Sequence, residues 1–212
     1  MAPARPFADR RGAGRRLALR LEGSSGERPI VFGMARGGVP VAAVVAEVLG
    51  APLDALVVRK IGAPRQPEFA VGAIARGVVR FDEVTIERLG ISRLTIAESV
   101  AREQVELERR ERRYRAGRPE LVLEGRVVIL VDDGLATGLS ALAGLEALRA
   151  RRPSRLVFAA PVCAPESVSV VRQVAAEVVC VLAPSNFETV GQWYDDFSPT
   201  SDEEVVELLD RP

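Results

Sequence analysis

Short apolar segments rich in valine and isoleucine alternate along the chain with longer segments whose apolar residues recur every three or four positions. The short segments predict β-strands and the longer ones predict α-helices. Such alternation is typical of a mostly parallel sheet with helices on its faces. We expect strands at residues 30–32, 53–59, 70–75, 78–81, 127–131, 155–160 and 177–182. We expect helices at residues 39–49, 94–115, 139–151, 165–175 and 202–209.

Two details refine this fold. Only Arg76 and Gly77 separate the strands at 70–75 and 78–81, which predicts an antiparallel hairpin attached to the parallel strands. Near the N-terminus, the spacing of Phe7, Leu17 and Leu21 favours an amphipathic helix over an organelle presequence. The sequence therefore predicts an α/β fold: an open, mostly parallel sheet flanked by helices, in a single domain spanning residues 1–212.

Composition narrows the possible partners. The chain has 212 residues, enough for one substantial core, and its 29 basic and 29 acidic residues cancel. We therefore expect neither nucleic acid nor a membrane surface as a partner. The arginine-rich run at 109–115 could form a nucleic-acid patch, but interleaved glutamates favour a solvated helix with i,i+4 ion pairs.

The residue types present also limit the chemistry. The absence of histidine removes the commonest general base and metal ligand. Cys163 and Cys180 lie in apolar runs and are interpreted as small hydrophobic residues, not as a disulfide. We find no apolar run of the roughly 18 to 20 residues that a membrane span needs and no secretory signal, and we expect a cytoplasmic protein. Lys60 is the single lysine, which is either chance or the mark of a specific role.

The segment VVILVDDGLATGLSA, residues 127–141, carries the most specific chemistry. Small residues between a strand and a helix let backbone N–H groups approach a phosphate at the helix start. Asp132 and Asp133 would repel that phosphate, so their natural partners are hydroxyl groups or a hydrated cation beside it. A phosphate next to vicinal hydroxyls describes a ribose 5-phosphate. The alternative is an ordinary strand-to-helix turn with Asp133 as N-cap.

Two further loops could hold a second anion. In IVFGMARGGVPVA, Gly33, Gly37 and Gly38 flank Arg36, which can bind phosphate oxygens through two N–H groups. In VVRKIGAPRQPEFA, Arg59 and Lys60 end a predicted strand. If these loops lie side by side, their cations form a positive pocket suited to a diphosphate.

These residues resemble a known family. ILVDDGLATG is similar to the phosphoribosyl pyrophosphate binding motif of type I phosphoribosyltransferases, and FGMARGGVPVA is similar to their pyrophosphate loop. The wider pattern, from DRRGAGRRLA through QPEFAVGAI to VGQWYDDF, resembles a bacterial branch of predicted phosphoribosyltransferases whose acceptor is unassigned.

The resemblance implies a role for each matching position. Asp132 and Asp133 would bind the ribose hydroxyls and, with Arg59 and Lys60, would form the catalytic set. The residues enclosing the 5-phosphate would be Leu135, Ala136, Thr137, Gly138, Leu139 and Ser140. The residues holding the pyrophosphate would be Ala35, Arg36, Gly37, Gly38, Arg59 and Lys60. Ala136 replaces a threonine found in many members, which removes one hydroxyl but not the backbone donor.

The activity implied is transfer of ribose 5-phosphate from phosphoribosyl pyrophosphate to a nitrogenous base, with Mg²⁺ as cofactor and a homodimer as the assembly. Mg²⁺ would have no strong direct protein ligand; Glu68 and Asp132 could contact it through water. Glu68 could instead accept a proton or simply face solvent. A small hood, built from the N-terminal helix and region 184–212, would cover the acceptor. There Phe187, Trp193 and Tyr194 either stack on the base or anchor the last helix. The alternative function is a non-catalytic sensor of phosphoribosyl pyrophosphate or nucleotides.

Overall fold

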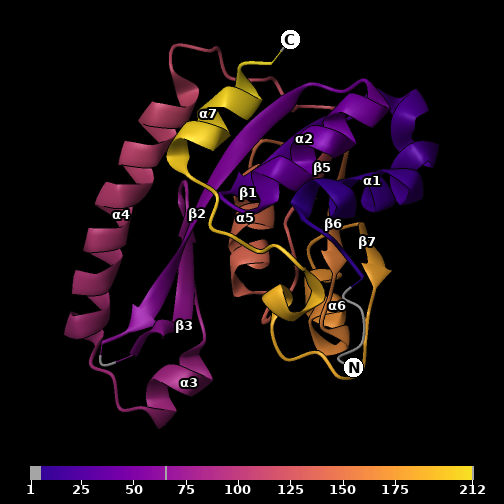
Figure 1. Cartoon of the computed structure of the whole chain (residues 1–212). Coiled ribbons are helices and arrows are strands. Elements are labelled where there is room, and N and C mark those ends of the chain that lie inside the picture. Colours follow the sequence, from indigo (N-terminus) through magenta and orange to yellow (C-terminus); the bar gives the residue numbers. More distant parts are fainter. Residues whose placement is uncertain (1–5, 65, 212) are drawn as a thin grey trace.

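The computed structural model describes residues 6–64 and 66–211, and these residues form an open sheet with helices on both faces (Figure 1). The strands are β1 (Ile30–Ala35), β2 (Leu53–Ala63), β3 (Gln66–Ala75), β4 (Val78–Phe81), β5 (Val127–Val131), β6 (Arg155–Val162) and β7 (Glu177–Leu182). Within the described residues their order across the sheet is β4-β3-β2-β1-β5-β6-β7. Strands β2, β1, β5, β6 and β7 are parallel, whereas β3 pairs antiparallel with β2 and β4. The predicted mostly parallel sheet and its hairpin are confirmed.

The helices are α1 (Arg10–Leu21), α2 (Gly38–Leu49), α3 (Glu83–Arg88), α4 (Arg93–Arg115), α5 (Leu139–Arg149), α6 (Pro165–Val171) and α7 (Asp202–Leu209). Two short 3-10 helices, η1 (Glu22–Glu27) and η2 (Val190–Trp193), complete the elements. Helices α1, α2, α4 and α7 contact one another and cover one face, while α5 packs on the other (Figure 1). No helix among the described residues is long and apolar enough to cross a membrane.

Apolar side chains along the strands point alternately to the two faces of the sheet, so the core lies on both faces. Leu56, Val58 and Leu130 belong to the core under α5, whereas Val57 and Ile129 belong to the cores under α4 and α2. Successive strand side chains point to opposite faces, so this pattern also fixes where the polar residues at the strand ends point.

Helix α3 was not predicted. It is six residues long, and Asp82 caps it by accepting a hydrogen bond from the Thr85 amide at 3.0 Å. An aspartate N-cap was visible in the sequence, but the helix is too short to display a hydrophobic period. Strands β2 and β3 are also longer than predicted, because the hairpin extends beyond the carboxyl edge of the parallel strands.

The prediction of two unpaired cysteines is wrong. Cys163 and Cys180 form a disulfide with their Cα atoms 6.3 Å apart. Cys163 directly follows β6 and Cys180 lies on β7, and these strands pair side by side. Their apolar surroundings were predicted correctly, since Cys163 is buried and Cys180 packs against the same core.

The charged helix α4 carries the ion pairs expected from its sequence. Glu106 contacts Arg110, four residues later, at 2.6 Å, and Arg112 contacts Glu108 at 4.0 Å. Arg109 and Arg113 reach further, to Asp202 at the start of α7, at 3.0 and 3.3 Å. The arginine run therefore joins two helices of the fold.

The first described residues lie beside the segment around Tyr194. Phe7 and Tyr194 form a parallel bridge, in which the Phe7 amide donates to the Trp193 carbonyl and the Asp195 amide donates to the Phe7 carbonyl. The chain between η2 and α7 then runs across the molecule, below α2 in the view of Figure 1, to reach α7. Arg10, Val190 and Tyr194 thereby lie against the loop that follows β5.

Candidate active site

The loop after β5 has the form predicted for a phosphate cradle. Gly138 adopts a left-handed conformation with φ of 86°, and α5 begins at Leu139. A helix start leaves four backbone N–H groups without intrahelical partners, and the helix dipole favours an anion there. Thr137 is exposed and Ser140 partly exposed, so both hydroxyls lie within reach of solvent.

Leu135 is tied into the fold by its backbone and its side chain. Its amide donates to the Val162 carbonyl at 2.8 Å, its carbonyl accepts from the Ala164 amide at 2.7 Å, and its side chain is buried. The buried Ser167 of α6 also donates a hydrogen bond to the Ala136 carbonyl. Leu135 therefore anchors the loop on β6, and its role beside the 5-phosphate stays a prediction.

The two aspartates differ in their contacts. Asp132 Oδ1 accepts a hydrogen bond from the Asp133 amide at 2.9 Å. Asp133 Oδ2 accepts from Arg10 Nε at 2.8 Å and lies 2.8 Å from a second Arg10 nitrogen. Both side chains of this ion pair are largely buried, at 12% exposure for Arg10 and 15% for Asp133. Sequence reasoning missed Arg10, which is 123 positions away from its partner.

The acid pair is held at an electrostatic cost. Burial, followed by the charge of Asp133, raises the pKa of Asp132 well above its ordinary value. Burial also raises the pKa of Asp133, although the charge of Arg10 and its hydrogen bond act in the opposite direction. Two adjacent, partly buried carboxylates of this kind favour a ligand that supplies hydroxyl donors or a cation.

The loop after β1 interlocks with the acid pair. Ala35 and Arg36 are joined by a cis peptide bond. A side chain at Gly37 would place its Cβ 2.0 Å from Asp133 Oδ2, and one at Gly38 would place its Cβ 2.5 Å from the Val131 carbonyl oxygen. Glycine at both positions lets the two loops touch. Arg36 lies 3.5 Å from Asp202, the first residue of α7.

Arg59 and Lys60 lie on opposite faces of β2. Arg59 pairs with Ile74, on the α4 side, and forms an ion pair with Glu103 of α4 at 2.8 Å. Lys60 pairs with Ala73, on the α5 side, and its charge lowers the pKa of both aspartates. The structure therefore brings Lys60 toward the acid pair, whereas Arg59 is held on the opposite face by Glu103, and a role for Arg59 at the pyrophosphate stays a prediction. Strand alternation in the sequence could have separated the two.

The C-terminal aromatic side chains contribute mainly to packing. Tyr194 is fully buried, its hydroxyl donates to the Asp133 carbonyl at 2.6 Å, and its ring lies 5.3 Å from Phe7 and 5.0 Å from Phe197. Of the two roles considered for Tyr194, the structure supports the packing one, because no ring surface is left for an acceptor. Phe187 and Trp193 are partly buried against this cluster. The side chain of Glu68 lies outside the described part of the structure.

Comparison with known proteins identifies the family of this chain. The family model described as the phosphoribosyl transferase domain matches residues 10–197. The chain belongs to this family. That match runs from Arg10 through both glycine loops and the acid pair to Phe197.

Relatives of this phosphoribosyl transferase domain agree in sequence and in structure. Two strains of Mycobacterium tuberculosis, H37Rv and CDC 1551, each have a protein named "Putative phosphoribosyl transferase" that is 46% identical over 206 residues. The match covers 97% of this chain, which spans 46% of the length of these relatives. The crystal structure of TT1426 from Thermus thermophilus is 42% identical, with a TM-score of 0.78, and covers 96% of this chain and 97% of that one.

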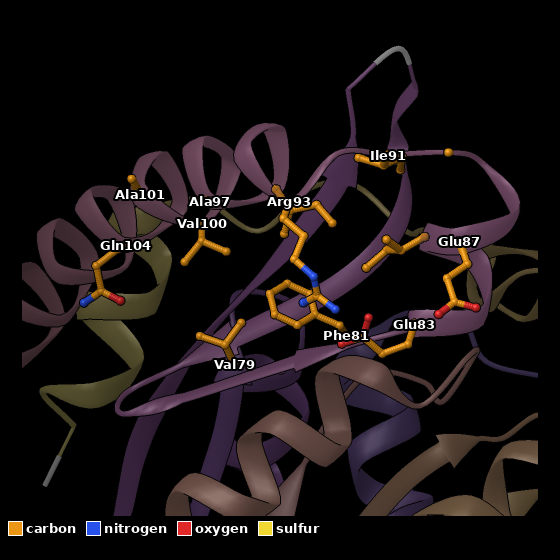
Figure 2. Close-up of a pocket in the computed structure, with 13 residues that line it drawn as sticks. Val79, Phe81, Glu83, Glu87, Ile91, Arg93, Ala97, Val100, Ala101 and Gln104 are labelled. Atoms are coloured by element: carbon orange, nitrogen blue, oxygen red, sulfur yellow. The ribbon is translucent and has the colours of Figure 1, made fainter.

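A separate cavity of about 620 Å³ lies away from the site of this phosphoribosyl transferase domain. It is lined mainly by apolar residues of β4, α3 and α4, including Val79, Phe81 and Ile96. Figure 2 shows the Arg93 side chain reaching toward Phe81, with Glu83 nearby. Phe81 pairs with Gly72 and Val79 with Ile74, which places the cavity on the α4 side of the sheet. None of the described residues predicted to bind the sugar phosphate lines it.

Proposed function

We propose that the chain is a phosphoribosyltransferase that transfers ribose 5-phosphate from phosphoribosyl pyrophosphate to a nitrogenous base and releases pyrophosphate. One observation carries the proposal: the glycines of the β1 loop lie directly against Asp132 and Asp133, next to the α5 helix start. A phosphate cradle, an acid pair and a cation-bearing loop thus converge at the carboxyl edge of the sheet, where such folds bind ligands.

Each part of the donor has a matching group. In the proposed complex Ala136, Thr137, Gly138, Leu139 and Ser140 hold the 5-phosphate, and Asp132 and Asp133 accept hydrogen bonds from the ribose hydroxyls. The pyrophosphate lies against Ala35, Gly37 and Gly38, where Arg36 and Lys60 neutralise its charge. For Arg36 this requires exchange of Asp202 for the ligand, since the two side chains are 3.5 Å apart.

The residues fit Mg²⁺ only together with a phosphorylated ligand. The described residues contain no group of three or more acidic or cysteine side chains placed to hold a metal ion. Mg²⁺ commonly keeps several waters and binds through one or two carboxylates plus substrate phosphates, which suits the adjacent Asp132 and Asp133. We propose that Asp132 contacts the ion through water. When bound, Mg²⁺ would supply positive charge to the pyrophosphate.

The chemical step needs alignment more than a general base. The acceptor nitrogen forms a bond to the anomeric carbon as the bond from that carbon to the pyrophosphate oxygen breaks. The pyrophosphate leaves with the bonding electron pair, and the sugar passes through an oxocarbenium-like transition state. The loops fix the donor for this attack, and Lys60 and Arg36 stabilise the negative charge on the leaving group.

We propose that the N-terminal helix and region 184–212 form the hood over the acceptor, with Phe187 and Trp193 as the remaining aromatic candidates for contact with the base. Both rings are only partly buried against the cluster that contains Tyr194, and Tyr194 itself contacts Asp133; these two observations support the proposal. A homodimer in the cytoplasm is the assembly that the family resemblance favours, and sedimentation of the purified protein would test the dimer.

Turnover is tested by incubating the protein with Mg²⁺, phosphoribosyl pyrophosphate and a panel of nitrogenous bases while measuring pyrophosphate release. Release that depends on one base supports the transferase. Tight binding without release across a broad panel would support a sensor instead.

A second experiment tests the assignment of the acid pair. Replacing Asp132→Asn together with Asp133→Asn should weaken binding of phosphoribosyl pyrophosphate far more than binding of free pyrophosphate, because only the former carries ribose hydroxyls. Calorimetry that finds equal losses for both ligands would contradict the assignment.

A further inference from the structure

The contact between Arg10 and Asp133 uses only one carboxylate oxygen. Arg10 Nε donates to Oδ2 at 2.8 Å, and a second guanidinium nitrogen lies 2.8 Å from the same atom. The more frequent arrangement for this pair of side chains is bidentate, with one N–H group on each oxygen. The geometry here fixes the position of the carboxylate through Oδ2, and Oδ1 takes no part in the contact with Arg10.

Arg10 is itself held in place by the C-terminal segment. Its guanidinium carbon lies 4.0 Å from the centre of the Phe197 ring, and a guanidinium nitrogen donates to the Ser198 carbonyl at 2.7 Å. An arginine whose guanidinium stacks on an aromatic ring and hydrogen-bonds to two partners keeps little conformational freedom. The side chain is thus fixed in position before any ligand arrives.

The backbone of Asp133 is supported from the same segment. The buried Tyr194 hydroxyl donates to the Asp133 carbonyl at 2.6 Å. A side chain at Gly134 would place its Cβ 2.4 Å from Val190, so η2 packs directly against the next residue of the loop. Both the backbone and the side chain of Asp133 are therefore positioned by residues from the two ends of the described chain.

We propose that Arg10 is a positioning residue for Asp133: it holds Oδ2 so that Oδ1 can accept a hydrogen bond from a ribose hydroxyl, and the Phe197–Ser198 segment holds Arg10 for this purpose. This inference rests on the proposed function. It also gives the C-terminal aromatic residues a role in donor binding, through Arg10, that does not depend on the acceptor.

The test is calorimetry with phosphoribosyl pyrophosphate and, separately, with free pyrophosphate, both with Mg²⁺. Arg10→Ala should weaken binding of the sugar diphosphate by about tenfold, the loss expected for a charged hydrogen bond. Binding of free pyrophosphate should not change. Arg10→Lys, which keeps the charge, should recover part of the loss. Arg15→Ala, an exposed arginine on the same helix, is the matched control and should behave as the wild type.

A double-mutant cycle shows whether Arg10 acts through Asp133. In the Asp133→Asn background, Arg10→Ala should cause little further loss, because the two residues form one unit. Three outcomes would overturn the inference: equal losses for both ligands, full additivity of the two changes, or tighter binding by Arg10→Ala. Tighter binding would mean that Arg10 competes with the ligand. Melting curves of each variant identify any that fail to fold. If Arg10→Ala does not fold, the binding measured for Arg10→Lys tests the inference instead. If wild-type protein does not bind phosphoribosyl pyrophosphate, the proposed function fails as well; normal wild-type binding with unaffected variants overturns only the role of Arg10.

Discussion

A β-carbon on Gly37 would lie 2.0 Å from Oδ2 of Asp133 and 3.3 Å from Nε of Arg10. The first distance is shorter than any non-bonded contact allows, so Gly37→Ala must displace the carboxylate or the β1 loop. We expect this change to weaken binding of phosphoribosyl pyrophosphate by at least about tenfold, since both loops proposed to bind the donor meet at this point. Calorimetry of the purified variant measures the loss.

Gly23→Ala is the control for this substitution. A β-carbon at Gly23 meets no atom within 4 Å, so the variant should bind like the wild type. Unchanged binding by a folded Gly37→Ala protein would show that the contact between the two loops does not shape the site.

Arg59 and Lys60 provide a matched pair of neighbouring cations. Lys60→Ala should lower turnover strongly, because Lys60 faces the acid pair and is proposed to neutralise the departing pyrophosphate. Arg59→Ala should instead leave turnover nearly unchanged and cost about 1 kcal/mol of unfolding free energy, since it removes a partly exposed ion pair with Glu103. Steady-state kinetics and urea unfolding separate the two effects.

Reversed outcomes for this pair would contradict the structure. Loss of turnover in a stable Arg59→Ala protein would mean that Arg59 leaves Glu103 to reach the ligand. Normal turnover in Lys60→Ala would show that the single lysine has no role in the reaction.

Asp202 should make stability depend on pH. Burial alone would raise its pKa, but hydrogen bonds from Tyr114 and Arg109 and the charge of Arg110 outweigh burial and lower the pKa from 3.8 to about 2. A carboxyl whose pKa is lowered on folding stabilises the protein above its unfolded pKa, and this stability is lost as the pH falls through the folded value. Asp202→Asn should therefore cost roughly 2 kcal/mol at pH 7.

The difference between the wild type and Asp202→Asn should shrink as the pH falls from about 4 toward 2, where the wild-type carboxyl becomes protonated. Urea unfolding of both proteins at pH 7 and at several acid pH values measures it. A difference that stays constant across this range would show that charge at Asp202 is not what joins α4 to α7.

The disulfide between Cys163 and Cys180 should contribute to stability. It closes a loop with a sequence separation of 17, for which chain entropy predicts about 3 kcal/mol. Reducing agent should therefore lower the melting temperature of the wild type. The double variant Cys163→Ala with Cys180→Ala should melt at a lower temperature with or without reductant, and equal sensitivity of both proteins to reductant would argue against the bond.

Local sequence was sufficient for the elements of the site that are continuous in the chain. The apolar run 127–131, the two aspartates and the small residues after them specify a strand, a turn and a helix start within fifteen positions. The glycine loop after β1 could be predicted for the same reason. The separation of Arg59 from Lys60 was also present in the sequence, in the alternation of Val57, Arg59 and Ile61 with Leu56, Val58 and Lys60.

Contacts between distant residues could not be predicted in this way. Arg10 and Asp133 are 123 positions apart, and nothing in the spacing of either indicates the other. The disulfide depends on β6 and β7 being neighbours, which is a property of the strand order and not of the two cysteine segments. The burial of Tyr194 likewise depends on Phe7 and Phe197 enclosing its ring from separate segments.

The pairing of Phe7 with Tyr194 bears on when the protein becomes competent during its synthesis. Arg10 and Asp133 are both translated before the segment that holds them in place. Because chains are made at about 5 to 20 residues per second, about 1 to 3 seconds pass between completion of β7 at Leu182 and addition of Ser198, and during this time the Asp133 carboxylate is not yet fully supported. The site proposed for the donor would then be complete only after residue 198 has been added.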